Sequence, residues 1–447
     1  MKLSFTGATE TVTGSQYLIN SEGKRYLVDF GLYQGPEPIS RMNRREFPWE
    51  PSEIQAVFLT HAHMDHSGMI PWLVKNGFKG RVHCTPETFE LCKILLIDSG
   101  KIQEGDYKKE FKKNEKAQKP LYTEEDAINS FDSFVTHEFK HEFHVDHLKA
   151  SFTRAGHIPG AASLRLVTPQ TSVIFSGDIG RYDDPLMYPP EAPPSADYVV
   201  METTYGNRLH DTTPPEEELI KYLELIKKRS SKLIVPTFAV ARAQLLIHLF
   251  KQVFHKRPDL KVPFFVHSPM TEKVTNLYKD FHMQLRIDES EVHSWDEFAR
   301  FIHWKKESEN VDRKPGPAII MAASGMVSGG KIVEHLKELG DEEQNIILLT
   351  GYQAEGTPGR EILEGSTRLK ISDVKIEIKA EVHVLKSLSA HADGQGLHRW
   401  LDAISPRPKK VFLSHGEEDG REGFAELISK DGYEVEIPPL DAVYNLI

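Results

Sequence analysis

The chain has 447 residues, of which 39% are hydrophobic and 27% are charged, and its formal net charge is −11. Two cysteines are too few for a disulfide framework, and no apolar run approaches the roughly 18 residues of a membrane span. The acidic balance excludes a strongly basic nucleic-acid binder, although a site with two divalent cations can be locally positive. The start of the chain lacks the apolar segment of a signal peptide, so we expect a cytoplasmic protein that does not enter a membrane.

The first predicted element is a β-hairpin over residues 15–31, "SQYLINSEGKRYLVDFG". Two runs rich in β-branched and aromatic residues flank Glu22-Gly23, and a glycine in so short a connection is typical of a hairpin turn.

The next strand runs into "HAHMDH", residues 61–66, where four side chains that bind metals occur within six residues. His61 and His63 project together, because residues i and i+2 of an extended segment point the same way. Asp65 and His66 follow on a turn and can face a second point. A zinc ion takes three or four ligands, and four such close neighbours rarely converge on one ion, so the cluster favours two metals. Nitrogen and oxygen ligands suit zinc, and less specifically iron or manganese.

Residues 101–119, "KIQEGDYKKEFKKNEKAQK", contain seven lysines. A solvated helix is the favoured interpretation of this segment, and a surface that faces nucleic acid is the alternative.

Three further candidate ligands each follow an apolar run or lie between glycines: His157 in "RAGHIPGAAS", Asp178 in "IFSGDIGR" and His415 in "FLSHGEED". Active sites of α/β proteins collect on the loops at strand ends, so these distant positions can meet in one site. A lone His-x-His pair is easily a chance pair of surface histidines, but matching distant positions argue against chance. A carboxylate such as Asp178 can bridge two ions.

The middle of the chain repeats a strand–turn–helix pattern four times, over residues 231–250, 262–281, 317–336 and 345–363. Serial units of this kind predict a parallel sheet with helices on its faces.

The pattern of His61, His63, Asp65 and His66, with His157 and Asp178, resembles the metal signature of the metallo-β-lactamase fold. Glu202 in "METTYG", His391 in "SAHAD" and His415 in "LSHGE" resemble motifs A, B and C of its β-CASP group. The segments "FAVARAQ", "ASGMVSGG" and "GYQAEGTPGR" are similar to the cap-domain signatures of that group. Its members process nucleic acids, and a histidine at motif C is typical of those that act on RNA.

The resemblance, which covers nearly the whole chain, implies an α/β fold: a metallo-β-lactamase αββα sandwich with an inserted β-CASP cap domain. The expected boundaries are 1–207 for the N-terminal part of the lactamase-like domain, 208–380 for the cap and 381–447 for the C-terminal part. By the family pattern, one zinc ion takes His61, His63 and His157, the second takes Asp65, His66 and His415, and Asp178 bridges them. Asp29 is expected to hold the ligand loop in place.

The implied activity is hydrolysis of RNA phosphodiester bonds by a two-metal hydroxide mechanism, which leaves 5′-phosphate and 3′-hydroxyl ends. Asp65 is a candidate base, and His391, oriented by Glu202, is a candidate acid or a stabiliser of transition-state charge. Endonucleolytic cleavage is favoured, with a 5′-3′ exoribonuclease as the alternative, and a homodimer is plausible.

Phosphate-binding candidates come from turns and one cation. Backbone N–H groups in a glycine-rich turn before a helix can hold a phosphate. The candidates are Ser324, Gly325, Met326, Ser389 and Arg242. A tight turn without a ligand and, for Arg242, a surface ion pair are the competing interpretations.

Three other functions compete with the ribonuclease. A small-molecule hydrolase would have no use for Glu202, His391 and the inserted units. A non-catalytic scaffold would be expected to have lost ligands, and all seven are present. A redox diiron protein usually has glutamate where this chain has His63.

Overall fold

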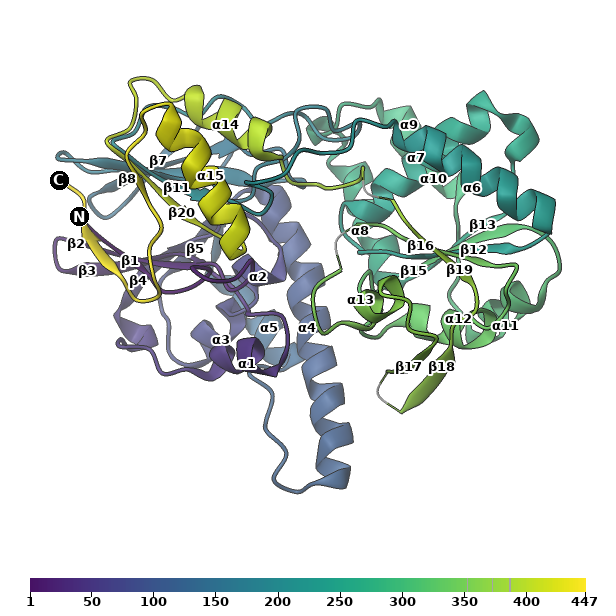
Figure 1. Ribbon diagram of the computed structural model, residues 1–447. Helices are drawn as coiled ribbons and strands as arrows, with labels where there is room; N and C mark the ends of the chain where they lie inside the picture. Colours follow the sequence, from purple (N-terminus) through teal and green to yellow (C-terminus); the bar gives the residue numbers. More distant parts are fainter. Residues whose placement is uncertain (352, 372, 386) are drawn as a thin grey trace. The chain divides into compact units, whose positions relative to one another are not determined.

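The computed structural model describes residues 1–351, 353–371, 373–385 and 387–447. The chain forms two compact units, one of residues 1–209 with 391–447 and one of residues 210–390 (Figure 1). The sequence predicts these transitions at 207/208 and 380/381. Each unit is described by itself below.

The first unit contains two seven-stranded sheets. The order in the first sheet is β22-β1-β2-β3-β4-β5-β6: β22 (Val443–Asn445), β1 (Lys2–Phe5), β2 (Gln16–Ser21), β3 (Lys24–Phe30), β4 (Ile54–Phe58), β5 (Arg81–Cys84) and β6 (Phe134–Thr136). The order in the second is β21-β20-β11-β10-β9-β8-β7: β21 (Val435–Glu436), β20 (Lys410–Ser414), β11 (Tyr198–Glu202), β10 (Ser172–Phe175), β9 (Ala162–Val167), β8 (Leu148–Arg154) and β7 (Glu142–Val145). The helices of this unit are α1 (Glu37–Ser40), α2 (Met64–Ser67), α3 (Ile70–Lys75), α4 (Pro86–Lys113), α5 (Glu124–Ser130), α14 (Gly394–Asp402) and α15 (Glu418–Lys430).

A hydrophobic core joins the two sheets face to face. Phe5, Tyr17, Phe175 and Phe412 are buried in one cluster with side chains from both sheets, and the ring centroids of Tyr17 and Phe175 are 5.3 Å apart. Full burial of such a side chain contributes about 1.5–3 kcal/mol. A second cluster packs α14 and α15 against the outer face of the second sheet, and α3, α4 and α5 lie on the side of the first sheet (Figure 1). The layers confirm the predicted αββα sandwich.

The predicted hairpin is confirmed as β2 and β3, which pair antiparallel. Glu22 and Gly23 have φ values of 50° and 77°. A two-residue turn with both residues in the left-handed region matches the twist of the strands that it joins.

The second unit is built on a six-stranded parallel sheet in the order β14-β13-β15-β12-β16-β19. Its strands are β14 (Arg300–Phe301), β13 (Phe264–His267), β15 (Ala318–Ala322), β12 (Lys232–Pro236), β16 (Ile346–Leu349) and β19 (Glu381–Val384), with a separate hairpin of β17 (Arg368–Ile371) and β18 (Val374–Glu377). The helices are α6 (Pro215–Arg229), α7 (Arg242–Lys256), α8 (Pro269–Asp280), α9 (Glu289–His293), α10 (Trp295–Phe298), α11 (Lys305–Arg313), α12 (Lys331–Leu339) and α13 (Pro358–Leu363). The strand and the helix of each of the four predicted units are present, with residue 352 in the turn of the fourth outside the described residues. The predicted parallel sheet with flanking helices is confirmed.

Among the described residues, none of the helices combines the length and apolar character that a membrane crossing requires.

Candidate metal centre and active site

Parallel pairing aligns the strand ends that carry the site. In the first sheet β3 and β4 are parallel neighbours, so Asp29 near the end of β3 lies beside the chain that leaves β4. In the second sheet β10, β11 and β20 are parallel neighbours, and Glu202 at the end of β11 is in register with Ser414 at the end of β20. Asp178, Glu202 and His415 therefore reach the same edge, as the sequence pattern suggested.

The first group of ligand atoms belongs to His61, His63, His157 and Asp178, and these atoms lie within 4.8 Å of one another. His63 Nδ1 is 3.1 Å from His61 Nε2 and 3.2 Å from His157 Nε2. Donors bound to one tetrahedral zinc ion at about 2.0–2.1 Å lie about 3.3 Å from one another. The spacing of the three imidazole nitrogens therefore fits a single ion.

The second group consists of Asp65, His66 and His415. His66 Nε2 is 3.0 Å from His415 Nε2, and Asp65 Oδ2 is 3.4 Å from His415 Nε2. This set of one carboxylate and two imidazoles again has the chemistry and spacing of a metal site.

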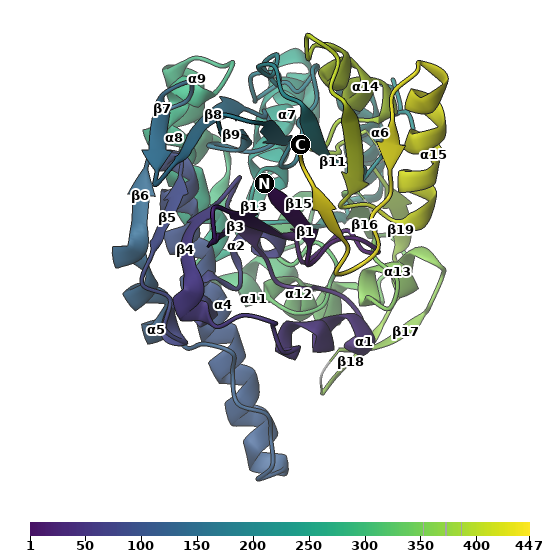
Figure 2. The same ribbon diagram turned by 90° about the vertical axis from the view of Figure 1, so that its left-hand side faces the viewer.

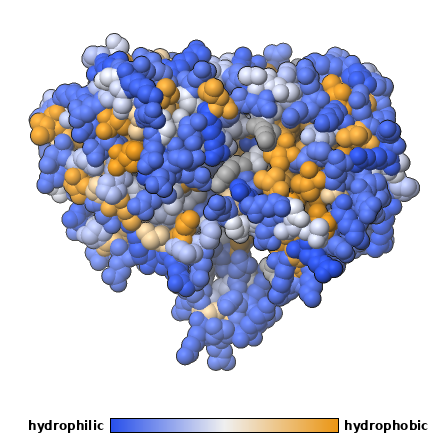
Figure 3. All heavy atoms as spheres, in the orientation of Figure 1, coloured by the Kyte–Doolittle hydropathy of each residue, from blue (hydrophilic) through white to orange (hydrophobic). Residues whose placement is uncertain are grey.

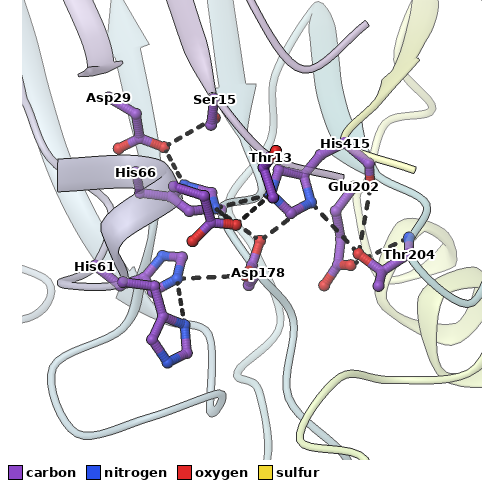
Figure 4. Close-up of polar contacts among 12 residues, drawn as sticks. Thr13, Ser15, Asp29, His61, His66, Asp178, Glu202, Thr204 and His415 are labelled. Carbon is purple, nitrogen blue, oxygen red and sulfur yellow. Dashed lines mark hydrogen bonds and ion pairs between the residues drawn. The ribbon is translucent and has the colours of Figure 1, made fainter. Parts of the chain in front are cut away.

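Asp178 connects the two groups (Figure 4). Its Oδ2 atom is 3.3 Å from His61 Nε2 and 3.6 Å from His157 Nε2. Its Oδ1 atom is 3.3 Å from His66 Nε2 and 3.7 Å from His415 Nδ1. The side chain is buried, and Oδ1 has no hydrogen-bond partner among the described residues. A buried carboxylate oxygen without a donor is costly unless a cation satisfies it, so Asp178 fits a metal site.

The electrostatics of the first group favour neutral imidazoles, which is the state that binds metals. Burial lowers the pKa of His63 to about 3, and the charge of neighbouring His61 acts in the same direction. Burial likewise lowers the pKa of His61 and of His157. Burial opposes the ionisation of Asp178, but His66 and His415 hold the pKa of this carboxyl well below its usual range.

Asp29 fixes the orientation of His66. Asp29 Oδ2 is 2.6 Å from His66 Nδ1, and the carboxylate accepts hydrogen bonds from Thr60 N at 2.8 Å and Thr60 Oγ1 at 2.9 Å. A carboxylate on the far nitrogen of a metal-binding histidine sets its tautomer and ring orientation. Asp29 has a φ of 54° and His415 a φ of 49°, a conformation that costs about 1–3 kcal/mol in a non-glycine residue and is concentrated at functional sites.

Gly31 allows the ligand loop to approach the first sheet. A Cβ atom at Gly31 would lie 1.7 Å from the carbonyl oxygen of Asp65. Leu32 N donates to the carbonyl oxygen of Met64 at 2.8 Å. Only glycine permits so close an approach of the two backbones.

Glu202 and His391 form a pair beside the metal groups. His391 Nδ1 is 3.2 Å from Glu202 Oε2, and Glu202 Oε1 accepts a hydrogen bond from Ile179 N at 2.5 Å. The rings of His391 and His157 are 4.4 Å apart. Burial opposes a charge on His391, but the Glu202 carboxylate outweighs it and raises the pKa of the imidazole to about 9.

The structure thus brings all seven expected ligands, together with Asp29, Glu202 and His391, into the first unit. The five phosphate-binding candidates Arg242, Ser324, Gly325, Met326 and Ser389 lie in the second unit. Arg242 Nη1 donates to the carbonyl oxygen of Thr350, and Ser324 N donates to the carbonyl oxygen of Gly329 at 3.3 Å. Their role in phosphate binding stays a prediction.

Several residues that support the ligands are not among the sequence-predicted candidates. Thr60 holds Asp29, Thr204 Oγ1 lies 3.4 Å from His415 Nδ1, and Tyr17 OH lies 2.8 Å from Ser414 Oγ. Thr60 could have been noticed, because it directly precedes His61. Tyr17 carries no such signal, since it is 397 residues from Ser414.

Comparison with known protein families matches residues 10–236 to the metallo-beta-lactamase superfamily, 243–362 to the Beta-Casp domain and 375–438 to the Zn-dependent metallo-hydrolase RNA specificity domain. The chain is 32% identical to Ribonuclease TTHA0252 of Thermus thermophilus, with 98% of each chain covered. It is 26% identical to transcription termination factor FttA of Methanosarcina mazei, over 94% of this chain and 67% of the relative. It is 28% identical to cleavage and polyadenylation specificity factor 73 of Drosophila melanogaster, over 92% of this chain and 59% of the relative.

A solved structure from Enterococcus faecalis, described as a protein of unknown function, matches with a TM-score of 0.57 at 14% identity and covers 99% of both chains. At this identity the likeness shows the fold alone.

Proposed function

Because this chain belongs to the β-CASP ribonuclease family of the metallo-β-lactamase superfamily, we propose that it is a zinc-dependent ribonuclease that hydrolyses phosphodiester bonds of RNA. The observation that carries the proposal is the position of Asp178, whose two oxygens face two separate groups of metal ligands. Two ions in such an arrangement suit phosphodiester hydrolysis.

We assign one zinc ion to His61, His63 and His157, and a second to Asp65, His66 and His415, with Asp178 shared. When bound, the ions activate a water molecule near neutral pH and neutralise charge on the phosphate. Asp29 keeps His66 in the orientation that presents Nε2 to the site. Asp65 is the candidate base, because its carboxylate lies within the second ligand group.

His391 protonates the leaving 3′-oxygen. Its Nδ1 atom faces Glu202, so the proton that it delivers is on Nε2. Glu202 in turn is held by Ile179 N and stabilises the imidazolium, as a carboxylate next to a catalytic histidine does. The products are a 5′-phosphate and a 3′-hydroxyl. The buried, unpaired Cys84 and Cys92 agree with a reducing compartment, and we place the enzyme in the cytoplasm.

We propose endonucleolytic cleavage, and one experiment tests both the activity and its mode. The zinc-loaded protein is incubated with one structured RNA that is labelled in parallel at its 5′ or its 3′ end. The expected products are internal fragments with either label. Mononucleotides from the 5′-labelled end would instead show a 5′-3′ exoribonuclease.

The controls exclude a contaminating nuclease. His391→Ala protein should bind the metals and cleave at least about 10²-fold more slowly, while His144→Ala, which removes an exposed histidine on β7, should cleave at the parent rate. A protein that binds two zinc ions and cleaves neither labelled RNA would contradict the proposal and favour a small-molecule hydrolase.

A further inference from the structure

The second half of α4 extends away from the rest of the first unit, together with the chain that follows it (Figures 1 and 2). The buried residues of this helix end at Gly100, where a Cβ atom would lie 2.7 Å from the backbone of Thr123. From residue 101 to residue 113 the helix has no buried residue. We refer to residues 101–119 as the arm.

Contacts with the body stop near the base of the arm. Lys101 Nζ is 3.1 Å from Glu124 Oε1, and Leu121 N donates to Gln103 Oε1 at 3.0 Å. The helix nevertheless continues for ten residues beyond Gln103. An isolated helix of that length is marginal in water, so this half is maintained by its continuity with the packed half. It contributes no core and is therefore available for a partner.

The arm is basic on an acidic protein. It contains seven lysines and four acidic residues, whereas the whole chain carries a net charge of −11. The lysines are exposed, and among the described residues no ion pair joins the ammonium groups of Lys108, Lys112 or Lys116 to a carboxylate. Figure 3 shows the projection as largely hydrophilic.

The charges are sorted by helical face. At about 100° per residue, Lys101, Lys108 and Lys112 lie within about 40° of one another. Lys109 and Lys113 continue this face on one side. Asp106 and Glu110 lie on the back of the helix, whereas Glu104, near the base of the arm, lies about 40° from Lys108. Beyond Glu104, a polyanion can therefore follow Lys108 and Lys112 without passing a carboxylate.

Two aromatic side chains adjoin the lysine face. The ring centroids of Tyr107 and Phe111 are 5.6 Å apart, and 45% of Phe111 is exposed. A solvated helix gains nothing from an exposed phenylalanine. Proteins bind single-stranded nucleic acid by combining two features: basic side chains that follow the phosphate backbone and exposed aromatic rings that stack on bases.

We propose that the arm is a second RNA-contacting surface, which binds single-stranded RNA outside the metal centre. The proposal rests on the ribonuclease function proposed above. The base of α4 is tied to the metal-binding edge, because Thr85 Oγ1 donates to the carbonyl oxygen of Gly160, three residues after His157, at 2.7 Å. Lys108 lies about 33 Å along the helix from Pro86. At a stacked spacing of about 3.4 Å, an RNA must extend roughly ten nucleotides from the cleavage site to reach it.

The test compares unstructured RNAs of about 6 and about 30 nucleotides. The zinc-loaded enzyme carries the double substitution Lys108→Gln and Lys112→Gln. For binding measurements by fluorescence anisotropy, His391→Ala is added to both the variant and the parent so that the RNA is not cleaved during the measurement. For the long RNA we expect about tenfold weaker binding and a slope of log affinity against log salt that is smaller by about 1.4, since each lost phosphate contact on a single strand removes about 0.7. Cleavage of the short RNA should keep the parent kcat/KM.

Lys221→Gln combined with Lys228→Gln is the matched control, because it removes two exposed lysines from the helix α6 and should leave the long-RNA affinity unchanged. Tyr107→Ser with Phe111→Ser should weaken long-RNA binding without changing the salt slope, since stacking is not ionic.

The arm proposal would be overturned if the Lys108/Lys112 variant bound the long RNA with the same affinity and the same salt slope as the parent. The ribonuclease proposal would then remain intact. A change in sedimentation from dimer to monomer, with RNA binding unaltered, would make the arm a contact between two copies of the chain and would also overturn it. A parent enzyme that neither binds nor cleaves either RNA would refute the ribonuclease function itself, and the arm proposal with it.

Discussion

Each unit contains a buried array of histidine and aspartate side chains, and the two arrays differ in shape. In the first unit the donor atoms converge: nitrogens of His61, His63 and His157 and an oxygen of Asp178 lie within 4.8 Å of one another. In the second unit the array is a line. His267 Nδ1 is 2.9 Å from His335 Nε2, and His335 Nδ1 is 2.7 Å from Asp312 Oδ1.

The difference separates a metal site from a structural network. In the line, one proton between each pair of atoms satisfies both partners, so His267, His335 and Asp312 need no ion. In the converging array the nitrogens face one another around a common point, and hydrogen bonds cannot satisfy them all. Burial and residue type are alike in the two arrays, so convergence of the donor atoms is the feature that indicates metal binding.

Removal of the central carboxylate should have the largest effect, and it should distinguish the metal site of the first unit from the structural network of the second. Asp178→Ala is expected to lose both metals and to reduce RNA cleavage by about 10³-fold or more, because its two oxygens serve both ligand groups. Inductively coupled plasma metal analysis and the end-labelled RNA assay measure the two losses. Asp312→Ala is the matched control: it should destabilise the second unit by about 1–3 kcal/mol through the unpaired His335, with its zinc content unchanged. If Asp178→Ala retained two zinc ions, the bridging assignment would be wrong.

Loss of the proton donor should leave the metals in place. His391→Ala is expected to keep both zinc ions and to lower kcat by about 10²–10⁴-fold, which is the usual contribution of general acid catalysis. Glu202→Gln should lower kcat in the same direction, because it removes the carboxylate that faces Nδ1. Rapid-quench cleavage under single-turnover conditions, paired with metal analysis, checks both. Parent-rate cleavage by His391→Ala would rule out its role as the acid.

The linear array should make the stability of the second unit depend on pH. Burial, together with the charge of His335, lowers the pKa of His267 to about 4, against about 6.5 in an unfolded chain. Between these values the unfolded chain binds more protons than the folded one, so stability is full above pH 6.5 and falls as the pH drops toward 4. The loss is at most on the order of 3 kcal/mol.

Hydrogen exchange of peptides from β13 and α12, followed between pH 4 and 7 after correction for intrinsic exchange, resolves this loss. His267→Asn should flatten the pH dependence, whereas His144→Asn, at an exposed position, should leave it as in the parent. An unchanged slope in His267→Asn would show that another group titrates.

The smallest expected effect concerns the support of a ligand. Thr60→Val removes the hydroxyl that donates to Asp29 at 2.9 Å, and we expect about tenfold weaker zinc binding, at the low end for groups that orient a ligand. Thr350→Val removes a comparable buried hydroxyl, which donates to the carbonyl oxygen of Pro236 at 3.0 Å, and should not change zinc affinity. Competition with a fluorescent chelator measures both variants, and equal affinities would show that Thr60 does not support the ligand.

Local sequence determined much of this protein. The turn at Glu22-Gly23 and the four strand–turn–helix units follow from periodicity and turn chemistry, which act over a few residues. The adjacency of His61, His63, Asp65 and His66 identified a metal-binding loop, because four such side chains in six residues have few other uses. Apolar runs that end in a polar residue, or flanking glycines, suggested His157, Asp178 and His415, and recognition of the β-CASP motifs supplied Glu202 and His391.

Only the tertiary structure decided which of those residues belong to which group of metal ligands. The alignment of strands that lie up to hundreds of residues apart determines which oxygen of Asp178 faces which histidine. It also determines which nitrogen of His391 faces Glu202. For residues 101–119 the sequence allowed two interpretations, a solvated helix and a surface that faces nucleic acid. Only the packing showed that burial ends at Gly100, because whether a helix face is covered depends on what the rest of the chain places against it.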